Sequence, residues 1–145
     1  MADDGTDLIA RLFAREVPEI GTGTVEIKAI ARKPGYRSKL AVQSRDPAVD
    51  CIAACVGIRG FRIKNIVDAL GGERIDLIRW NDSPEQSVAN ALQPAAIERI
   101  VLYPVEHRAM VIVKADQASL ALGRGGWNCE LASQLSGWRI EVEKT

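Results

Sequence analysis

The sequence has no long hydrophobic run, and this scarcity excludes one class of protein. No apolar stretch reaches the roughly 18 to 20 residues that a membrane-spanning helix needs. The N-terminal residues Met1-Ala2-Asp3-Asp4 are acidic and do not resemble a secretion signal. We therefore expect a soluble, cytoplasmic protein with no membrane partner.

Cysteine and histidine are also too sparse for a disulfide framework or a metal site. Cys51, Cys55 and Cys129 are an odd number of cysteines in mostly apolar helical stretches, which favours reduced, buried thiols. The only histidine, His107, is far from the first two cysteines in the sequence and has no nucleophile pattern around it. Since no nucleotide-binding fingerprint is present either, we expect no metal, no cofactor, no small-molecule substrate and no enzymatic activity.

The sequence has no excess of either charge, because 19 basic residues balance 19 acidic ones. A nucleic-acid-binding protein often has a strongly basic total, so the charge distribution matters. Residues 28–64 contain nine basic residues against Asp46 and Asp50, which gives that segment a formal charge of +7. An ordinary solvated surface is the alternative interpretation of such a run.

Two short glycine-framed loops are the most informative feature of the chain. Gly57-Ile58-Arg59-Gly60 and Gly123-Arg124-Gly125-Gly126 begin 66 residues apart. In each half a further glycine, Gly71 or Gly137, follows the last loop glycine after eleven residues, as expected for a helix that ends in a glycine cap. One G-x-x-G alone would be weak evidence, but the shared spacing indicates two copies of one unit.

The hydrophobic periodicity predicts the same order of elements, α-β-β-α-α-β, in both halves. We expect residues 1–80 to form a first domain with an N-terminal helix and residues 81–145 to form a second. Ser83 and Pro84 are typical of a helix start, and Gln86 is placed to complete a capping box with Ser83. The expected helices are 6–17, 49–56, a helix from the first loop to about 70, one from 84, 115–122 and one from the second loop to 136; the expected strands are 24–32, 38–44, 74–80, 97–103, 108–114 and one from 139.

A glycine loop before a helix is suited to bind a phosphate. Glycine lets the backbone approach an anion closely, and the following helix directs its N–H groups and its positive dipole end toward the same space. An adjacent apolar groove, floored by the helix and a strand, could hold bases. We therefore predict that single-stranded RNA contacts the following residues: Gly57, Ile58, Arg59, Gly60, Arg62 and Lys64 at the first loop, and Gly123, Arg124, Gly125, Gly126, Trp127 and Asn128 at the second.

The residues around both loops resemble a known family. Val56 to Ile63 is similar to the KH signature, and the element order resembles the type II KH arrangement. Longer runs, including 25–32, 46–60, 88–92, 122–126 and 131–138, resemble the tandem KH core of the NusA transcription factors. The resemblance implies an α+β fold with two type II KH domains, each a three-stranded sheet covered by helices.

For function, the resemblance implies an RNA-binding factor that acts with the RNA polymerase elongation complex in termination or antitermination. The sequence has no counterpart of the polymerase-binding domain and oligonucleotide-binding barrel of bacterial members, and so resembles the short archaeal form. Cys129 stands where the KH signature has a larger aliphatic residue, and we expect this to loosen the second unit. The alternative is a KH-type scaffold that binds protein partners and has little RNA affinity.

Overall fold

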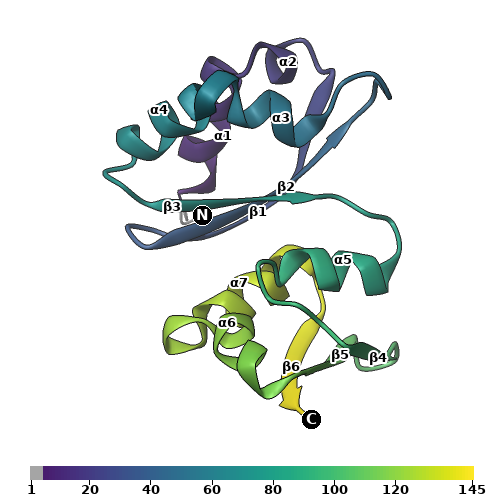
Figure 1. Ribbon diagram of the computed structural model, residues 1–145. Coiled ribbons are helices and arrows are strands. Elements are labelled where there is room, and N and C mark those ends of the chain that lie inside the picture. The colour runs from purple at the N-terminus through teal and green to yellow at the C-terminus, as the bar shows by residue number, and fades with distance from the viewer. Residues whose placement is uncertain (1–4) are drawn as a thin grey trace. The chain divides into compact units, whose positions relative to one another are not determined.

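The computed structural model describes residues 5–145 and divides the chain into two compact units, Met1–Trp80 and Asn81–Thr145. The acidic residues Met1 to Asp4 lie outside the described part of the chain. Each unit has a three-stranded sheet with helices on one face (Figure 1). The predicted α+β fold and the order of elements are confirmed in both units.

The first unit contains the sheet β1-β2-β3. β1 pairs with β2 in antiparallel fashion and β2 pairs with β3 in parallel, as an α-α connection between β2 and β3 requires. The structure adds a short helix, α2, that the sequence did not predict. The elements are α1 (Thr6–Glu16), α2 (Pro18–Gly21), β1 (Val25–Lys33), β2 (Arg37–Ser44), α3 (Cys51–Val56), η1 (Ile58–Gly60), α4 (Phe61–Ala69) and β3 (Arg74–Arg79).

The second unit repeats this plan in the sheet β4-β5-β6, with the same antiparallel and parallel pairings. Ser83 caps the first helix as predicted, since its Oγ accepts a hydrogen bond from the N–H of Gln86. The capping box was wrong, because the Gln86 side chain bonds Asn90 instead of turning back to Ser83. The elements are α5 (Pro84–Ala91), β4 (Arg99–Tyr103), β5 (Arg108–Val113), η2 (Ala115–Gln117), α6 (Ala118–Leu122), η3 (Arg124–Gly126), α7 (Trp127–Ser136) and β6 (Arg139–Lys144).

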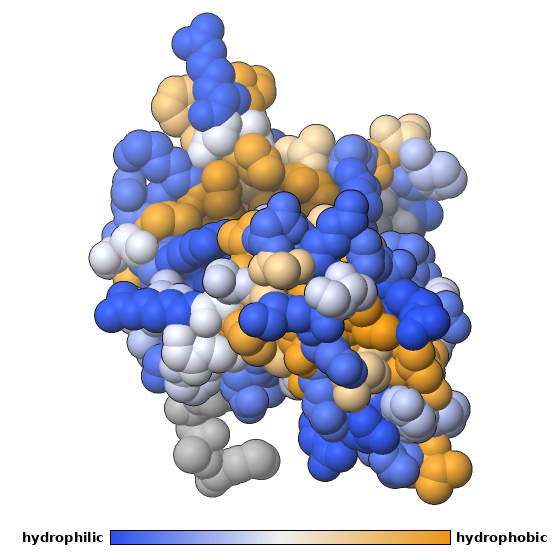
Figure 2. All heavy atoms as spheres, turned by 60° about the horizontal axis from the view of Figure 1, so that its bottom comes forward, coloured by the Kyte–Doolittle hydropathy of each residue, from blue (hydrophilic) through white to orange (hydrophobic). Residues whose placement is uncertain are grey.

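Each unit has its own apolar core between its sheet and its helices. In the first unit Phe13 of α1 and Ile66 of α4 pack with Leu40 of β2, and all three are fully buried. Val88 of α5, Val111 of β5 and Leu131 of α7 are fully buried in the second. Outside the cores, the face drawn in Figure 2 carries hydrophilic side chains with hydrophobic ones exposed between them.

The cysteines lie where their sequence context suggested. Cys51 and Cys55 are buried and Cys129 is half-buried, and none of the three forms a disulfide. Burial raises the pKa of the Cys55 thiol to about 12, so this thiol stays protonated at neutral pH. No helix within residues 5–145 combines the length and apolar character needed to cross a membrane.

Buried charge distinguishes the first unit, and the sequence did not reveal it. The carboxylate of Glu73, which is 1% exposed, accepts hydrogen bonds from Arg32, from Ser38 and from the backbone N–H of Gly35. These bonds tie the residue before β3 to both ends of the β1–β2 turn. Because Glu73 is far along the chain from its partners, spacing gives no sign of this cluster.

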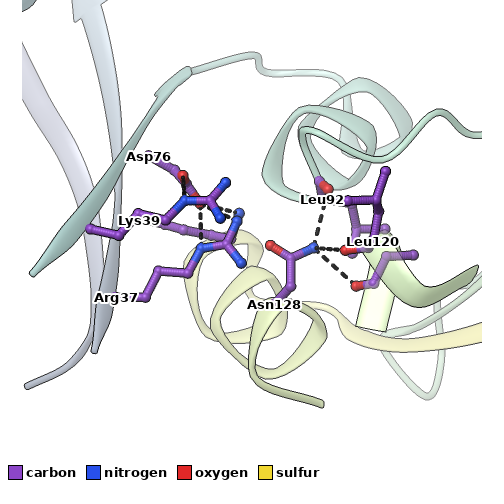
Figure 3. A network of polar contacts seen from close by, with 8 residues as sticks. Arg37, Lys39, Asp76, Leu92, Leu120 and Asn128 are labelled. Atoms are coloured by element: carbon purple, nitrogen blue, oxygen red, sulfur yellow. Dashed lines mark hydrogen bonds and ion pairs between the residues drawn. The ribbon is translucent and has the colours of Figure 1, made fainter. Parts of the chain in front are cut away.

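A second charged cluster lies across β2 and β3 on the sheet (Figure 3). Both Arg37, through Nε at 2.7 Å, and Lys39, through Nζ at 3.0 Å, donate to Oδ2 of Asp76. Burial lowers the pKa of Lys39 to about 8, although the Asp76 charge partly opposes this. The two clusters engage four of the nine basic residues of segment 28–64 inside the first unit.

We predict that Glu73→Gln destabilises the first unit. Arg32 would keep its buried position without a counter-charge, and breaking a buried pair in this way costs about 3 to 5 kcal/mol of unfolding free energy. Denaturant unfolding followed by circular dichroism measures the loss. Glu141→Gln, which changes an exposed carboxylate in the second unit, is the matched control and should change stability by less than about 1 kcal/mol.

The same carboxylate should make stability depend on pH. Burial raises the pKa of Glu73, but the Arg32 and Ser38 hydrogen bonds outweigh it and hold the pKa below its ordinary value of 4.5. Its stabilising contribution is therefore complete above that value and is lost as the pH falls through the lower pKa of the folded state. Acidification below about pH 4.5 should cost the wild type more than Glu73→Gln. Equal losses in both proteins would contradict this role for Glu73.

Candidate nucleic-acid interface

The two loops adopt the same backbone conformation. The first glycines have φ/ψ of 77/173° at Gly57 and 75/176° at Gly123. The third positions are left-handed, at 54/23° for Arg59 and 61/17° for Gly125. The last glycines, Gly60 and Gly126, are left-handed as well. Sequence spacing located both loops, and each is followed directly by a helix as predicted.

The first glycine of each loop is required for two reasons. A positive φ with ψ near 180° is a region that is essentially restricted to glycine. In addition, a Cβ at Gly57 would lie 2.5 Å from Cγ of Arg62, and a Cβ at Gly123 would lie 2.6 Å from Cβ of Asn128. The chain therefore passes too close to the following helix for any other residue at these positions.

Arg62 and Asn128 occupy equivalent positions, two residues after the last loop glycine, and they act alike. Nη1 of Arg62 donates to the backbone oxygen of Ala54 at 2.7 Å, near the end of α3. Nδ2 of Asn128 donates to the backbone oxygens of Leu120 and Ala121 at the end of α6, and also to that of Leu92 (Figure 3). Each side chain thus joins the helix before the loop to the helix after it.

This finding changes the interpretation of three predicted contact residues. Asn128 is fully buried and its amide is engaged with carbonyl groups, so in this conformation it supports the loop instead of contacting RNA. Arg62 is half-buried and forms an ion pair with Glu19 at 2.9 Å. Lys64 is exposed but is paired with Asp68 one turn along the same helix. Sequence spacing placed these residues near the loops but could not show which way their side chains turn.

The loop residues themselves lie at the surface. Ile58 is 82% exposed, and the side chains of Arg59 and Arg124 are exposed as well. Within residues 5–145, Arg59 forms no hydrogen bond or ion pair. The loop N–H groups of Gly60 and Gly126 are taken up by the oxygens of Gly57 and Gly123. The amides that helix geometry leaves for an anion are those of the two middle residues of each loop.

The segment with a charge of +7 does not form an unpaired basic surface. Besides the buried pairs of Arg32, Arg37 and Lys39, Arg45 pairs with Glu26 at 2.7 Å, and Lys28 lies over the Trp80 ring. Most of the carboxylate partners lie outside residues 28–64, which is why the segment seemed so basic. The positive potential at the first loop therefore depends on Arg59 and on the start of α4.

A groove lies beside the loop in each unit. In the second unit a groove of about 600 Å³ runs between α7 and β6 and reaches Gly126, which fits the predicted floor of a helix and a strand. Cys129 lines it, and its Sγ donates to the Ile140 oxygen of β6 at 3.3 Å. In the first unit a groove of about 510 Å³ lies on the α3 side of the loop, from Glu19 to Gly57.

The other residues singled out in the sequence have structural surroundings. His107 lies in the β4–β5 turn as predicted, and its ring stacks on Trp138 with centroids 4.2 Å apart. Trp138 is buried, which agrees with its expected place in a core. The described residues contain no group of three or more His, Cys, Asp or Glu side chains that could hold a metal ion.

Comparison with family models decides the relationship. Residues 4–80 match the model of the NusA-like first KH domain, and residues 84–145 match that of the NusA-like second KH domain. The chain belongs to the NusA-like KH family. Its two loops are therefore the G-x-x-G loops of two tandem KH domains.

Three bacterial proteins named transcription termination/antitermination protein NusA are similar in sequence. Identity is 50% over 137 residues for Thermus thermophilus, and 46% over 136 residues for both Bacillus subtilis and Halalkalibacterium halodurans. The alignments cover 94% of this chain but 35 to 37% of the relatives, so the chain spans about a third of their length. The crystal structure of APE1850 shares the fold, with a TM-score of 0.61 and 24% identity over 90% of this chain and 96% of that one.

We predict that Gly123→Ala destabilises the second KH domain more than Gly126→Ala. Both changes place a side chain at positive φ, but a Cβ at Gly126 meets no atom within 4 Å, whereas one at Gly123 lies 2.8 Å from the backbone nitrogen of Asn128. Strain at the left-handed position costs about 1 to 2 kcal/mol, and the overlap at Gly123 should add about 1 to 3 kcal/mol. Thermal unfolding of the two variants measures the difference, and equal melting temperatures would show that the close approach is not a constraint.

Proposed function

We propose that this chain binds single-stranded RNA at both G-x-x-G loops, as the RNA-binding part of a NusA-like termination or antitermination factor. One observation carries the proposal: two exposed loops share one backbone conformation, and each directs an arginine and the N-terminus of a helix toward the same solvent-facing site. Neither helix has a side-chain cap at its first turn. The N-terminal N–H groups and the positive dipole end are therefore suited to a phosphate.

The contact residues proposed at the first loop are Gly57, Ile58, Arg59 and Gly60, and those at the second are Gly123 to Trp127. Middle-loop amides and the two arginines would bind phosphates. The groove between α7 and β6 would hold bases of the same strand, with Glu130, Ser133 and Gln134 among its polar lining residues. This arrangement needs no covalent chemistry. Association with RNA polymerase is part of the proposal through the named relatives.

The competing proposal is a protein-binding scaffold with little RNA affinity. The internal pairing of most bases in segment 28–64 favours it, because this pairing reduces the positive surface that RNA would meet. Exposed Ile58 could serve either function. The two proposals differ in what a reversal of loop charge does to RNA binding.

We predict that Arg59→Asp combined with Arg124→Asp weakens the affinity for a short single-stranded RNA by at least about tenfold, equivalent to about 1.4 kcal/mol. A carboxylate in each loop would repel the phosphate that the loop amides bind. Arg11→Asp combined with Arg99→Asp is the matched control, since it changes the total charge equally at exposed arginines of α1 and β4. Fluorescence anisotropy titration measures both affinities. Equal affinity of the loop double variant and the wild type would favour the scaffold.

We also predict a shallow salt dependence. Each phosphate neutralised on a single strand contributes about −0.7 to the slope of log affinity against log salt concentration, so one phosphate per loop gives about −1.4. Because internal ion pairs already occupy most bases of segment 28–64, a much steeper slope is not expected. Titrations at several salt concentrations measure it. A slope near −5 would indicate that a broader basic surface binds the RNA, and a slope of zero would exclude binding led by phosphates.

A further inference from the structure

The residue directly after each G-x-x-G loop is aromatic. Phe61 is the first residue of α4 and Trp127 is the first residue of α7, so the two rings occupy equivalent positions in the two domains. Sequence reasoning singled out Trp127 but not Phe61. The repetition of an aromatic residue at this one place, in two units whose loops are otherwise different, calls for a physical reason.

Phe61 has no role in the core of its domain. It is 58% exposed, whereas Ile66 of the same helix is fully buried in the core. Single exposed apolar side chains are normal on protein surfaces. Phe61 differs from Leu8, which is also exposed, because it adjoins a loop that offers an arginine and free helix amides to an anion.

Trp127 lies against its loop. A Cβ built on Gly125 would be 3.3 Å from Cδ1 of Trp127 and 3.7 Å from its Nε1, so the edge of the indole is in contact range of the loop backbone. Gly125 is the counterpart of Arg59, and its lack of a side chain leaves room for the ring. A phosphate bound by the middle-loop amides would place its own nucleotide within reach of this indole.

We propose that Phe61 and Trp127 are stacking platforms, each for the nucleobase adjacent to the phosphate held at its loop. The proposal rests on the RNA-binding function above and adds the residues that contact the bases there. A nucleobase is the occupant that fits, because it is a flat apolar ring attached to the anion for which Arg59, Arg124 and the helix N-termini provide complementary charge. Stacking on an aromatic side chain is a common way to bind an unpaired base.

The test is a series of substitutions at Phe61 in the full chain, titrated with a short single-stranded RNA of mixed sequence. Phe61→Ala should weaken binding about fivefold or more, the lower end of the effect of losing one base-stacking ring. Phe61→Leu should be similarly weak, because leucine is apolar but has no ring face, and Phe61→Tyr should restore affinity. The salt slope should stay at the wild-type value in all three, since no charge is changed.

An RNA of equal length made of abasic nucleotides separates stacking from a structural effect on the loop. Wild type and Phe61→Ala should bind it equally, because the phosphates are present and the bases are absent. A weaker affinity of Phe61→Ala for the abasic strand would overturn the proposal. Leu8→Ala, which removes an exposed apolar side chain of α1, is the matched control and should bind both RNAs like the wild type.

The two possible failures can be told apart. If the wild type binds the mixed RNA and Phe61→Ala binds it equally well, stacking is overturned and the phosphate-binding function stands. If the wild type binds neither RNA, the RNA-binding function fails and stacking fails with it. The corresponding series at Trp127, with Phe as the conservative substitution, applies the same criteria to the second loop.

Discussion

The close approach of the first loop glycine to the helix that follows is the constraint on which the site depends. At Gly57 and Gly123 the chain turns with a positive φ and touches the residue two places into the next helix, Arg62 or Asn128. That residue also bonds a carbonyl group at the end of the preceding helix. Two helices are thereby held at one angle, and the two middle residues of each loop have only solvent in front of them.

Two copies of one backbone allow the chemistry of each loop to differ. The first loop carries its arginine at the third position, where Arg59 adopts a left-handed conformation that costs about 1 to 2 kcal/mol in a residue other than glycine. The second loop has glycine there and carries Arg124 one position earlier, which leaves room for Trp127 against the backbone. The equal conformations show that the braces, and not the middle residues, determine the shape of the loop.

Much of this fold could be predicted from the sequence, because local patterns determine it. Glycine spacing, strand alternation and the Ser83-Pro84 helix start gave the order of elements. The capping box and α2 were missed or wrong because they depend on side-chain directions and on one short turn. The burial of Asn128 could not be predicted, since an asparagine beside a glycine loop is equally suited to contact a ligand. The equal spacing of Arg62 and Asn128 was the one available sign of their shared role.

The charge of the first domain shows why a local count of residues can mislead. Glu73 and Asp76 are separated by more than 30 residues from the bases they neutralise, and parallel pairing of β2 with β3 brings Asp76 beside Lys39. A buried pair contributes little net stability compared with apolar side chains of the same size, yet losing one partner is costly. The basic residues of β1 and β2 are therefore committed to the fold. Attraction for a polyanion then depends on helix dipoles and one arginine at each loop, which gives short-range binding that is sensitive to the geometry of the loops.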